Sequence, residues 1–190
     1  MRIITGTARG TRLLAPEGED VTRPTIEKAK EAIFSSIQFD IEGRDALDLF
    51  AGSGQLGLEA LSRGAAKCTF VDSSREAIRF VTENAQRTKL YQKSNVLCMD
   101  YAQYIKTAAG RSRFDLVFLD PPYSARLLPK ALVGLYDADM LKSTSIIVCE
   151  DEGDDITKDE EVTKRFSVTK QARYGRVYIF YLAVRGKDDE

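Results

Sequence analysis

Two short segments of this chain combine residue types that could perform chemistry, and each directly follows an apolar run of strand length. The first is the glycine turn, residues 52–57 (GSGQLG), which lies between the run 46–50 and apolar residues at helical spacing. Its glycines let the backbone approach a ligand closely, and the start of the next helix offers unpaired N–H groups. The second is the acceptor loop, residues 120–123 (DPPY), which follows the run 114–119.

The acceptor loop predicts a site that binds an amino group. Pro121 and Pro122 fix the backbone and lack N–H donors, so their carbonyl groups are free to face outward. Asp120 only accepts hydrogen bonds when it is ionised, and Tyr123 offers a flat ring that could stack on a base. A turn that merely ends a strand would explain the prolines, but neither the acid nor the aromatic residue. An exocyclic NH2 group on a flat base fits these acceptors.

Three further acids lie in or directly after expected strands. Asp72 ends the run 67–71, about twenty residues after the first glycine, where an acid that binds a ribose is expected. Because a helical pattern starts just after it, Asp72 could also cap that helix. Asp48 lies inside the strand before the glycine turn and suits a ligand with a cationic amino-acid end. Asp100 follows the run 94–99 and is a good cap for the short helix expected next.

Composition describes an ordinary globular protein: 43% of the 190 residues are hydrophobic and 30% are charged. No apolar run approaches membrane-spanning length and the first residues have no signal-peptide pattern, so we expect a cytoplasmic protein with no membrane partner. Histidine is absent, which excludes histidine metal sites and Ser-His-Asp chemistry. The three cysteines, Cys68, Cys98 and Cys149, are expected to be reduced core thiols, and no metal is expected.

Charge is unevenly distributed although the net charge is only −1. Residues 1–16 contain Arg2, Arg9 and Arg12 and no acid, whereas residues 150–161 are dense in acids and are expected to form a solvated face. Phosphate binding depends on local patches, so the arginine-rich start predicts a phosphate-binding surface, with a solvated appendage as the alternative.

Strands and helices alternate through most of the chain, which predicts an α/β fold. The opening segments 2–5 and 11–15 suggest a β-hairpin, followed by a helix with Thr25 as its N-cap and a helical stripe through Ile37. We expect a Rossmann-like, doubly wound, mostly parallel seven-stranded sheet, with a C-terminal antiparallel hairpin and a small N-terminal β-hairpin plus helix. The expected units are residues 1–42, an appendage, and residues 43–190, the main domain. The expected later elements are strands 67–71, 94–99, 114–119 and 145–149, helices 74–90, 101–109 and 127–136, and the hairpin strands 165–172 and 176–184.

The sequence resembles the RsmD family of bacterial 16S rRNA guanine-N2 methyltransferases over essentially its full length. The matching blocks are residues 2–10, 22–34, 48–65 and 120–123, with Tyr174-Gly175 in the closing hairpin. The glycine turn and DPPY occur in many methyltransferases, whereas the segments TRPT and LSRGA are more specific to this family. Asp72 stands where the family often has a glutamate, and the N-terminal hairpin carries fewer basic residues than is usual in the family.

The resemblance implies a monomeric enzyme that uses S-adenosylmethionine, releases S-adenosylhomocysteine and needs no metal. Its implied partner is 16S rRNA, free or within a partly assembled small ribosomal subunit. It places Asp48, Gly52 and Gly54 near the methionine end of the cofactor, together with Ser53 and Gly57 of the same turn. It also places Asp72 at the ribose and Asp100 at the adenine amino group, unless Asp100 is only a helix cap. The implied catalytic residues are Asp120, Pro121 and Tyr123, and the implied RNA-binding residues are Arg2, Arg9, Arg12 and Arg23.

Other functions compete with guanine-N2 methylation. Adenine-N6 methyltransferases that act on DNA or RNA use the same DPPY loop, although the absence of a separate target-recognition domain argues against sequence-specific DNA modification. A nucleotide-binding oxidoreductase or a non-catalytic binding module would have no need of the acceptor loop. Phosphoryl transfer is excluded because no Gly-Lys-Ser/Thr follows the glycines.

Overall fold

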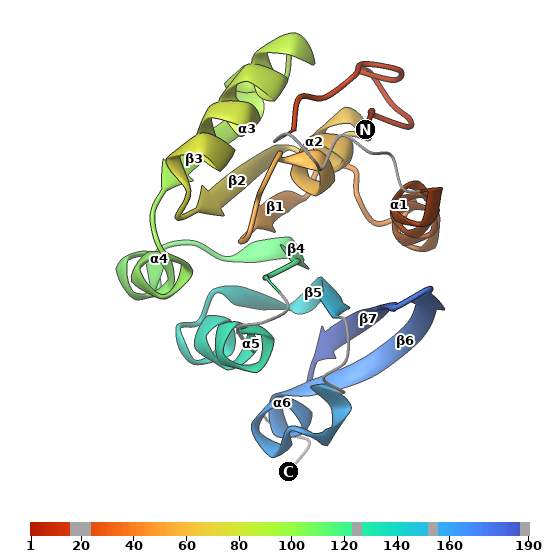
Figure 1. Cartoon of the computed structure of the whole chain (residues 1–190). Helices are drawn as coiled ribbons and strands as arrows, with labels where there is room; N and C mark the ends of the chain where they lie inside the picture. The colour runs from red at the N-terminus through yellow and green to blue at the C-terminus, as the bar shows by residue number, and fades with distance from the viewer. Residues whose placement is uncertain (16–23, 123–126, 152–155, 187–190) are drawn as a thin grey trace.

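A seven-stranded sheet forms the centre of the protein in a computed structural model, which describes residues 1–15, 24–122, 127–151 and 156–186 (Figure 1). The strand order is β3-β2-β1-β4-β5-β7-β6. Strands β1 to β5 pair in parallel, and β7 is antiparallel to both of its neighbours, β5 and β6. The predicted fold class is therefore confirmed. The strands are β1 (Asp45–Asp48), β2 (Lys67–Asp72), β3 (Ser94–Cys98), β4 (Phe114–Leu119), β5 (Leu141–Asp151), β6 (Phe166–Tyr174) and β7 (Val177–Val184).

Helices pack against both faces of the sheet, as alternation along the strands requires. In β4, Leu116 and Phe118 join one core with side chains of α1, α2 and α3, whereas Val117 and Leu119 join a second core with α4, α5 and α6. The helices are α1 (Pro24–Ser36), α2 (Gln55–Ser62), α3 (Arg75–Arg87), α4 (Tyr101–Ala108), α5 (Leu128–Asp137) and α6 (Glu160–Arg165), with short 3-10 helices at Tyr91–Lys93 and Ile156–Lys158. None of the helices within the described ranges is long and apolar enough to cross a membrane.

The N-terminal segment forms a single antiparallel bridge, Arg2 to Arg12, instead of two full strands. Beyond that bridge, two backbone N–H groups of the segment donate hydrogen bonds to a side chain of α2. The fully buried carboxylate of Glu59 accepts hydrogen bonds from Ile4 N at 2.7 Å and Thr5 N at 3.0 Å. Because these donors are used by a side chain, they cannot extend a strand ladder. The segment is instead fastened to the helix that follows the glycine turn.

Three local expectations were wrong. Cys98, expected to be a core thiol, is exposed, whereas Cys68 and Cys149 are buried. Helix α1 begins at Pro24, so Thr25 lies in its first turn and is not the N-cap; proline suits the first helical position because its missing N–H would have no partner there. The acidic segment is also more than a solvated face. Ile156 in this segment and Val162 directly after it are each only 2% exposed and belong to the second core, and Asp159 caps α6 by accepting hydrogen bonds from two backbone N–H groups.

Candidate active site

A cavity of about 420 Å³ lies where β1, β2 and β4 end, at the point where the strand order reverses between β1 and β4. Open α/β sheets bind ligands at such a switch, beyond the carboxyl ends of the strands. The size falls within the range of small-molecule sites. Predicted site residues that line this cavity, here called the acidic cavity, are Asp48, Gly52, Ser53, Asp72, Asp100, Asp120 and Pro121.

The three glycines of the turn have three different tasks. Gly52 lines the acidic cavity with φ +52°, and a Cβ atom added to it would meet no protein atom within 4 Å. Gly54, with φ +78°, is the N-cap of α2, and its added Cβ would lie 3.3 Å from Val81 on α3. At Gly57 an added Cβ would lie 2.3 Å from the ring of Phe70, so this glycine allows α2 to pack closely on β2. Only the first glycine borders the space that a ligand could fill.

Asp48 is a buried acid at the floor of the acidic cavity, only 2% exposed. Burial raises the pKa of its carboxyl group to about 8, a hydrogen bond from Gly57 N to Oδ2 at 3.0 Å opposes this rise, and the charges of Asp120 and Asp72 add to it. An acid held mostly protonated near neutral pH would gain its charge when a cation binds beside it.

Asp72 fixes the shape of the glycine turn. Its Oδ2 accepts a hydrogen bond from Gly52 N at 2.9 Å, and its Oδ1 accepts one from Ser74 N at 2.8 Å. The N-cap of α3 is Ser74, whose hydroxyl accepts from Ala77 N, so the alternative reading of Asp72 as that cap is wrong. Asp72 thus joins the end of β2 to the turn and lines the cavity between them.

Asp100 is the N-cap of α4 and also lines the acidic cavity. Both of its capping bonds, from Ala102 N and Gln103 N, end on Oδ1. The capping role predicted for Asp100 is therefore present, and its second oxygen takes no part in it.

The acceptor loop meets the same cavity from β4. Asp120, Pro121 and Pro122 line it, and Pro121 is buried whereas Pro122 is exposed. Tyr123 lies outside the described residues. The predicted hydrogen-bond acceptors and the glycine turn thus face one space, although about seventy residues separate them in the sequence.

Glu150 is a titratable neighbour of this site that the sequence reasoning assigned to a solvated face. It lies near the end of β5, and burial raises its pKa well above the ordinary value, with the charges of Asp120 and Asp48 adding to the rise. The signal that could have identified it is its position directly after the apolar run 145–149, the same position that Asp72, Asp100 and Asp120 occupy after their apolar runs.

Further cavity residues were also missed. Phe50 and Tyr101 line the acidic cavity as a tilted aromatic pair, with ring centroids 5.3 Å apart. Gln55 lines it as well, and its buried Oε1 has no hydrogen-bond partner within the described part of the chain. A buried acceptor without a partner is costly, so Gln55 is suited to a ligand that carries a donor. Its place inside the glycine turn was the available signal.

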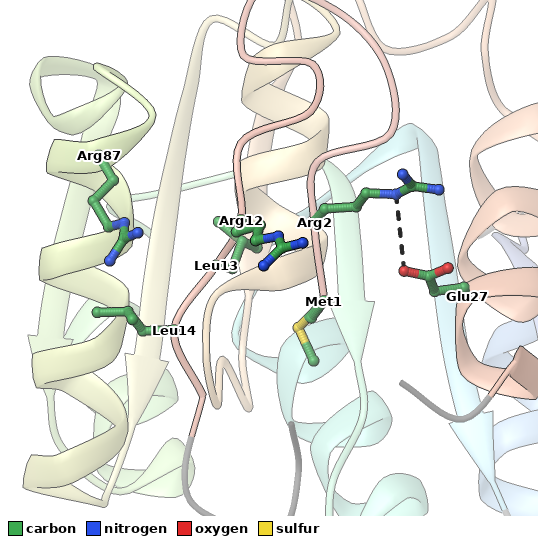
Figure 2. Close-up of a pocket in the computed structure, with 7 residues that line it drawn as sticks. All are labelled: Met1, Arg2, Arg12, Leu13, Leu14, Glu27 and Arg87. Carbon is green, nitrogen blue, oxygen red and sulfur yellow. Dashed lines mark ion pairs between the residues drawn. The ribbon is translucent and has the colours of Figure 1, made fainter. Parts of the chain in front are cut away.

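The predicted RNA-binding arginines are not all together. Arg2 and Arg12 line a second cavity of about 570 Å³, here called the arginine cavity (Figure 2). Arg9 is exposed but does not line it, and Arg23 lies outside the described residues. Met1 lines both cavities, and Ser53 donates a hydrogen bond to its sulfur at 3.3 Å. The two cavities therefore adjoin.

This sheet order, with its antiparallel β7 and a cavity at the β1/β4 switch, defines the Rossmann-like fold of the S-adenosylmethionine-dependent methyltransferases. A family model described as Conserved hypothetical protein 95 matches residues 1–183. The chain belongs to this family, and its resemblance to the RsmD family is confirmed.

Individual relatives agree with this assignment. The chain is 39% identical to the protein YlbH of Bacillus subtilis, over 98% of this chain and 100% of that protein. It is 36% identical to the ribosomal RNA small subunit methyltransferase D of Haemophilus influenzae, over 81% of this chain and 80% of the relative. Among solved structures, yhhF from Escherichia coli matches with a TM-score of 0.84 and 29% identity, covering 98% of this chain and 99% of that one.

Proposed function

We propose that this protein transfers a methyl group from S-adenosylmethionine to the exocyclic N2 amine of a guanine in 16S rRNA. In this proposal residues 43–190 form the methyltransferase domain and residues 1–42 form the RNA-docking unit. Activity on ribosomal RNA is supported by the family and by relatives named as small-subunit rRNA methyltransferases. The observation that supports an exocyclic amine as the methyl acceptor is the position of the acceptor loop. Its Asp120 and Pro121 line the same cavity as the glycine turn.

The acidic cavity fits the proposed cofactor. Gly52 leaves open space where any side chain would intrude, Asp48 suits an ammonium group, and Asp72 suits ribose hydroxyl groups. The Phe50–Tyr101 pair offers an apolar wall for the adenine ring, beside the Asp100 carboxylate for the adenine amine. When bound, the cofactor supplies an electrophilic methyl group on a positively charged sulfur.

The protein's own contribution to the reaction is positioning. The lone pair of guanine N2 is delocalised into the ring, and the nitrogen must lose a proton as it gains a methyl group. Asp120 and the carbonyl group of Pro121 would accept the two N–H bonds of this amine and hold the nitrogen against the methyl group. A carboxylate at this position accepts hydrogen bonds from the amine, and its negative charge would favour departure of the proton.

A paired guanine inside a helix cannot reach this cavity. The base must be unpaired or flipped out of its stack, and Tyr123 would then stack on it. The exposed arginines of the N-terminal segment would hold the RNA by its phosphates, which sets its position without reading its sequence.

The direct test is transfer of a labelled methyl group from S-adenosylmethionine to purified RNA, followed by digestion and identification of the labelled nucleoside. The substrates compared are free 16S rRNA, small subunits from cells that lack the gene, and DNA. We expect N2-methylguanosine in 16S rRNA. Labelled N6-methyladenine, in RNA or in DNA, would contradict the proposal and establish the alternative use of the acceptor loop.

A further inference from the structure

We propose that the arginine cavity binds a phosphate of the RNA strand next to the target base, and that Arg87 of α3 completes this phosphate site. This inference rests on the proposed function, because it assigns a place for the RNA backbone beside the methyl-transfer site. The cavity is lined by three guanidinium groups, those of Arg2, Arg12 and Arg87, against one carboxylate, that of Glu27.

The placement of Arg2 and Arg12 brings two like charges opposite each other. They are the two partners of the N-terminal bridge, so their side chains leave the same face of the paired segments directly opposite each other. Like charges in such cross-strand positions destabilise the pairing. The Arg2–Glu27 contact relieves this weakly, since it is 4.0 Å long and both side chains are partly exposed. A phosphate between the two arginines would attract both guanidinium groups and offset their mutual repulsion.

Arg87 is brought to the same cavity by a buried tie between α3 and the N-terminal segment. Asn84, fully buried one turn before Arg87, accepts a hydrogen bond from Leu14 N at 2.7 Å and donates one to Leu14 O at 2.8 Å. Its amide also donates to Ser53 O in the glycine turn at 2.9 Å. The Asn84 side chain therefore fixes α3, the segment that carries Arg12 and the rim of the acidic cavity relative to one another.

The two cavities share Met1 as a wall, so a strand bound by phosphate in the arginine cavity lies beside the acidic cavity. Phosphate oxygens and guanidinium forks match in geometry, and neither Arg12 nor Arg87 has an ion-pair partner within the described residues. RNA backbone is thus the ligand that fits both the charge of this cavity and its place in the molecule.

The test is binding of 16S rRNA by Arg87→Ala, measured over a series of salt concentrations. We expect the dissociation constant to rise about tenfold, as for one lost charge-assisted contact, and the logarithmic salt slope to fall by about 0.7–0.9. The KM for RNA should rise while kcat at saturating RNA and the affinity for S-adenosylmethionine stay unchanged. Arg87→Lys keeps the charge and should recover most of the salt slope.

The matched control is Arg79→Ala, because Arg79 lies on the same helix, is 64% exposed and pairs with Glu83 outside the cavity. It should bind RNA as the wild type does. If Arg87→Ala binds RNA with an unchanged affinity and salt slope while the wild type methylates rRNA, the inference is wrong and the proposed function stands. If the wild type neither binds nor methylates rRNA, both are wrong.

Discussion

The acidic cavity and the arginine cavity adjoin, yet their charges are opposite. The first is lined by Asp48, Asp72, Asp100 and Asp120, and Glu150 lies near enough to interact with two of them. The second has three arginines and one glutamate. A net charge of −1 for the whole chain conceals both, because it averages them. The charged lining residues of the two cavities are thus of opposite sign on either side of one shared wall residue, Met1.

The contrast matches two opposite demands of the proposed reaction. A cofactor with a sulfonium and an ammonium group needs negative surroundings, whereas the RNA backbone needs positive ones. Sorting these charges into separate cavities lets one molecule bind both ligands without repelling either. Variants that alter one cavity and leave the other intact test whether the two sets of charges act separately.

The largest effect is expected from Asp120→Ala. Its interaction with the amine matters most when the nitrogen is aligned for attack, so methyl transfer should fall by about a thousandfold or more. Binding of S-adenosylmethionine and of RNA should be nearly unchanged. Single-turnover kinetics and calorimetry measure these separately, with Asp137→Ala as the control, since that exposed acid pairs with Arg165 far from the cavity.

Loss of cofactor binding is the next effect in size, and Gly52→Val should cause it. A branched side chain there would project into the open space beside the turn. Gly110→Val is the matched control, because Gly110 also has a positive φ and an added Cβ would meet nothing within 4 Å, but it does not line the acidic cavity. Both variants should lose about 1–2 kcal/mol of stability from backbone strain. Equal cofactor affinity in the two would contradict the proposed use of the turn.

A smaller effect concerns pH and Asp48. With a pKa of about 8, this acid is mostly protonated in the free protein at neutral pH and must ionise beside a cationic ligand. Affinity for S-adenosylmethionine should therefore rise as the pH increases toward about 8 and then level off, with proton release that depends on pH. Calorimetry in buffers of different ionisation enthalpy would detect this release. Asp48→Asn should bind more weakly and show no such release.

The free energy of unfolding should also depend on the ionisation of Asp48, but it should fall as the pH rises. The folded protein holds the Asp48 proton up to a pKa of about 8, whereas the unfolded chain loses it near the ordinary value of 3.8. The native state thus binds more protons between these values, so the contribution of Asp48 to the free energy of unfolding declines as the pH rises through them. Asp48→Asn should remove this decline, and thermal unfolding at several pH values would show it.

The smallest expected effect belongs to single arginines of the N-terminal segment. Arg12→Ala should weaken RNA binding more than Arg9→Ala, because Arg12 lines the arginine cavity and Arg9 does not. The double variant should flatten the salt dependence by up to about 0.7–0.9 logarithmic units for each lost phosphate contact, with unchanged cofactor affinity and an unchanged methylated base. Equal salt slopes for the wild type and the double variant would remove this segment from the RNA-docking surface.

Most of the acidic cavity could be predicted from the sequence because its parts are local patterns. A strand, a glycine turn and an acid after the next strand lie in a fixed order, and parallel strands bring their carboxyl ends to one edge. Asp48, Asp72, Asp100 and Asp120 were found in this way, and all four line the cavity. Glu150 was missed because the run of acids after it looked like solvated surface.

The arginine cavity could not be predicted in the same way, because it depends on contacts between distant segments. No sequence pattern near Arg87 predicts that the buried Asn84 forms hydrogen bonds to the backbone of Leu14 and so holds their two segments together. The roles of Gly54 and Gly57 also depend on residues that are distant in the sequence. Val81 lies close to Gly54 and Phe70 lies close to Gly57, so these two glycines serve the packing of the helices and not the ligand site. Local motifs indicated that a ligand site exists, and tertiary contacts decided which residues border it.

The most direct measurement is a map of modified nucleotides in total RNA from three strains: one with the gene, one without it, and one that carries the Asp120→Ala variant. We expect a single N2-methylguanine of 16S rRNA in the first strain, and its absence from the other two. An unchanged map after deletion, or loss of an adenine modification instead, would contradict the proposed function.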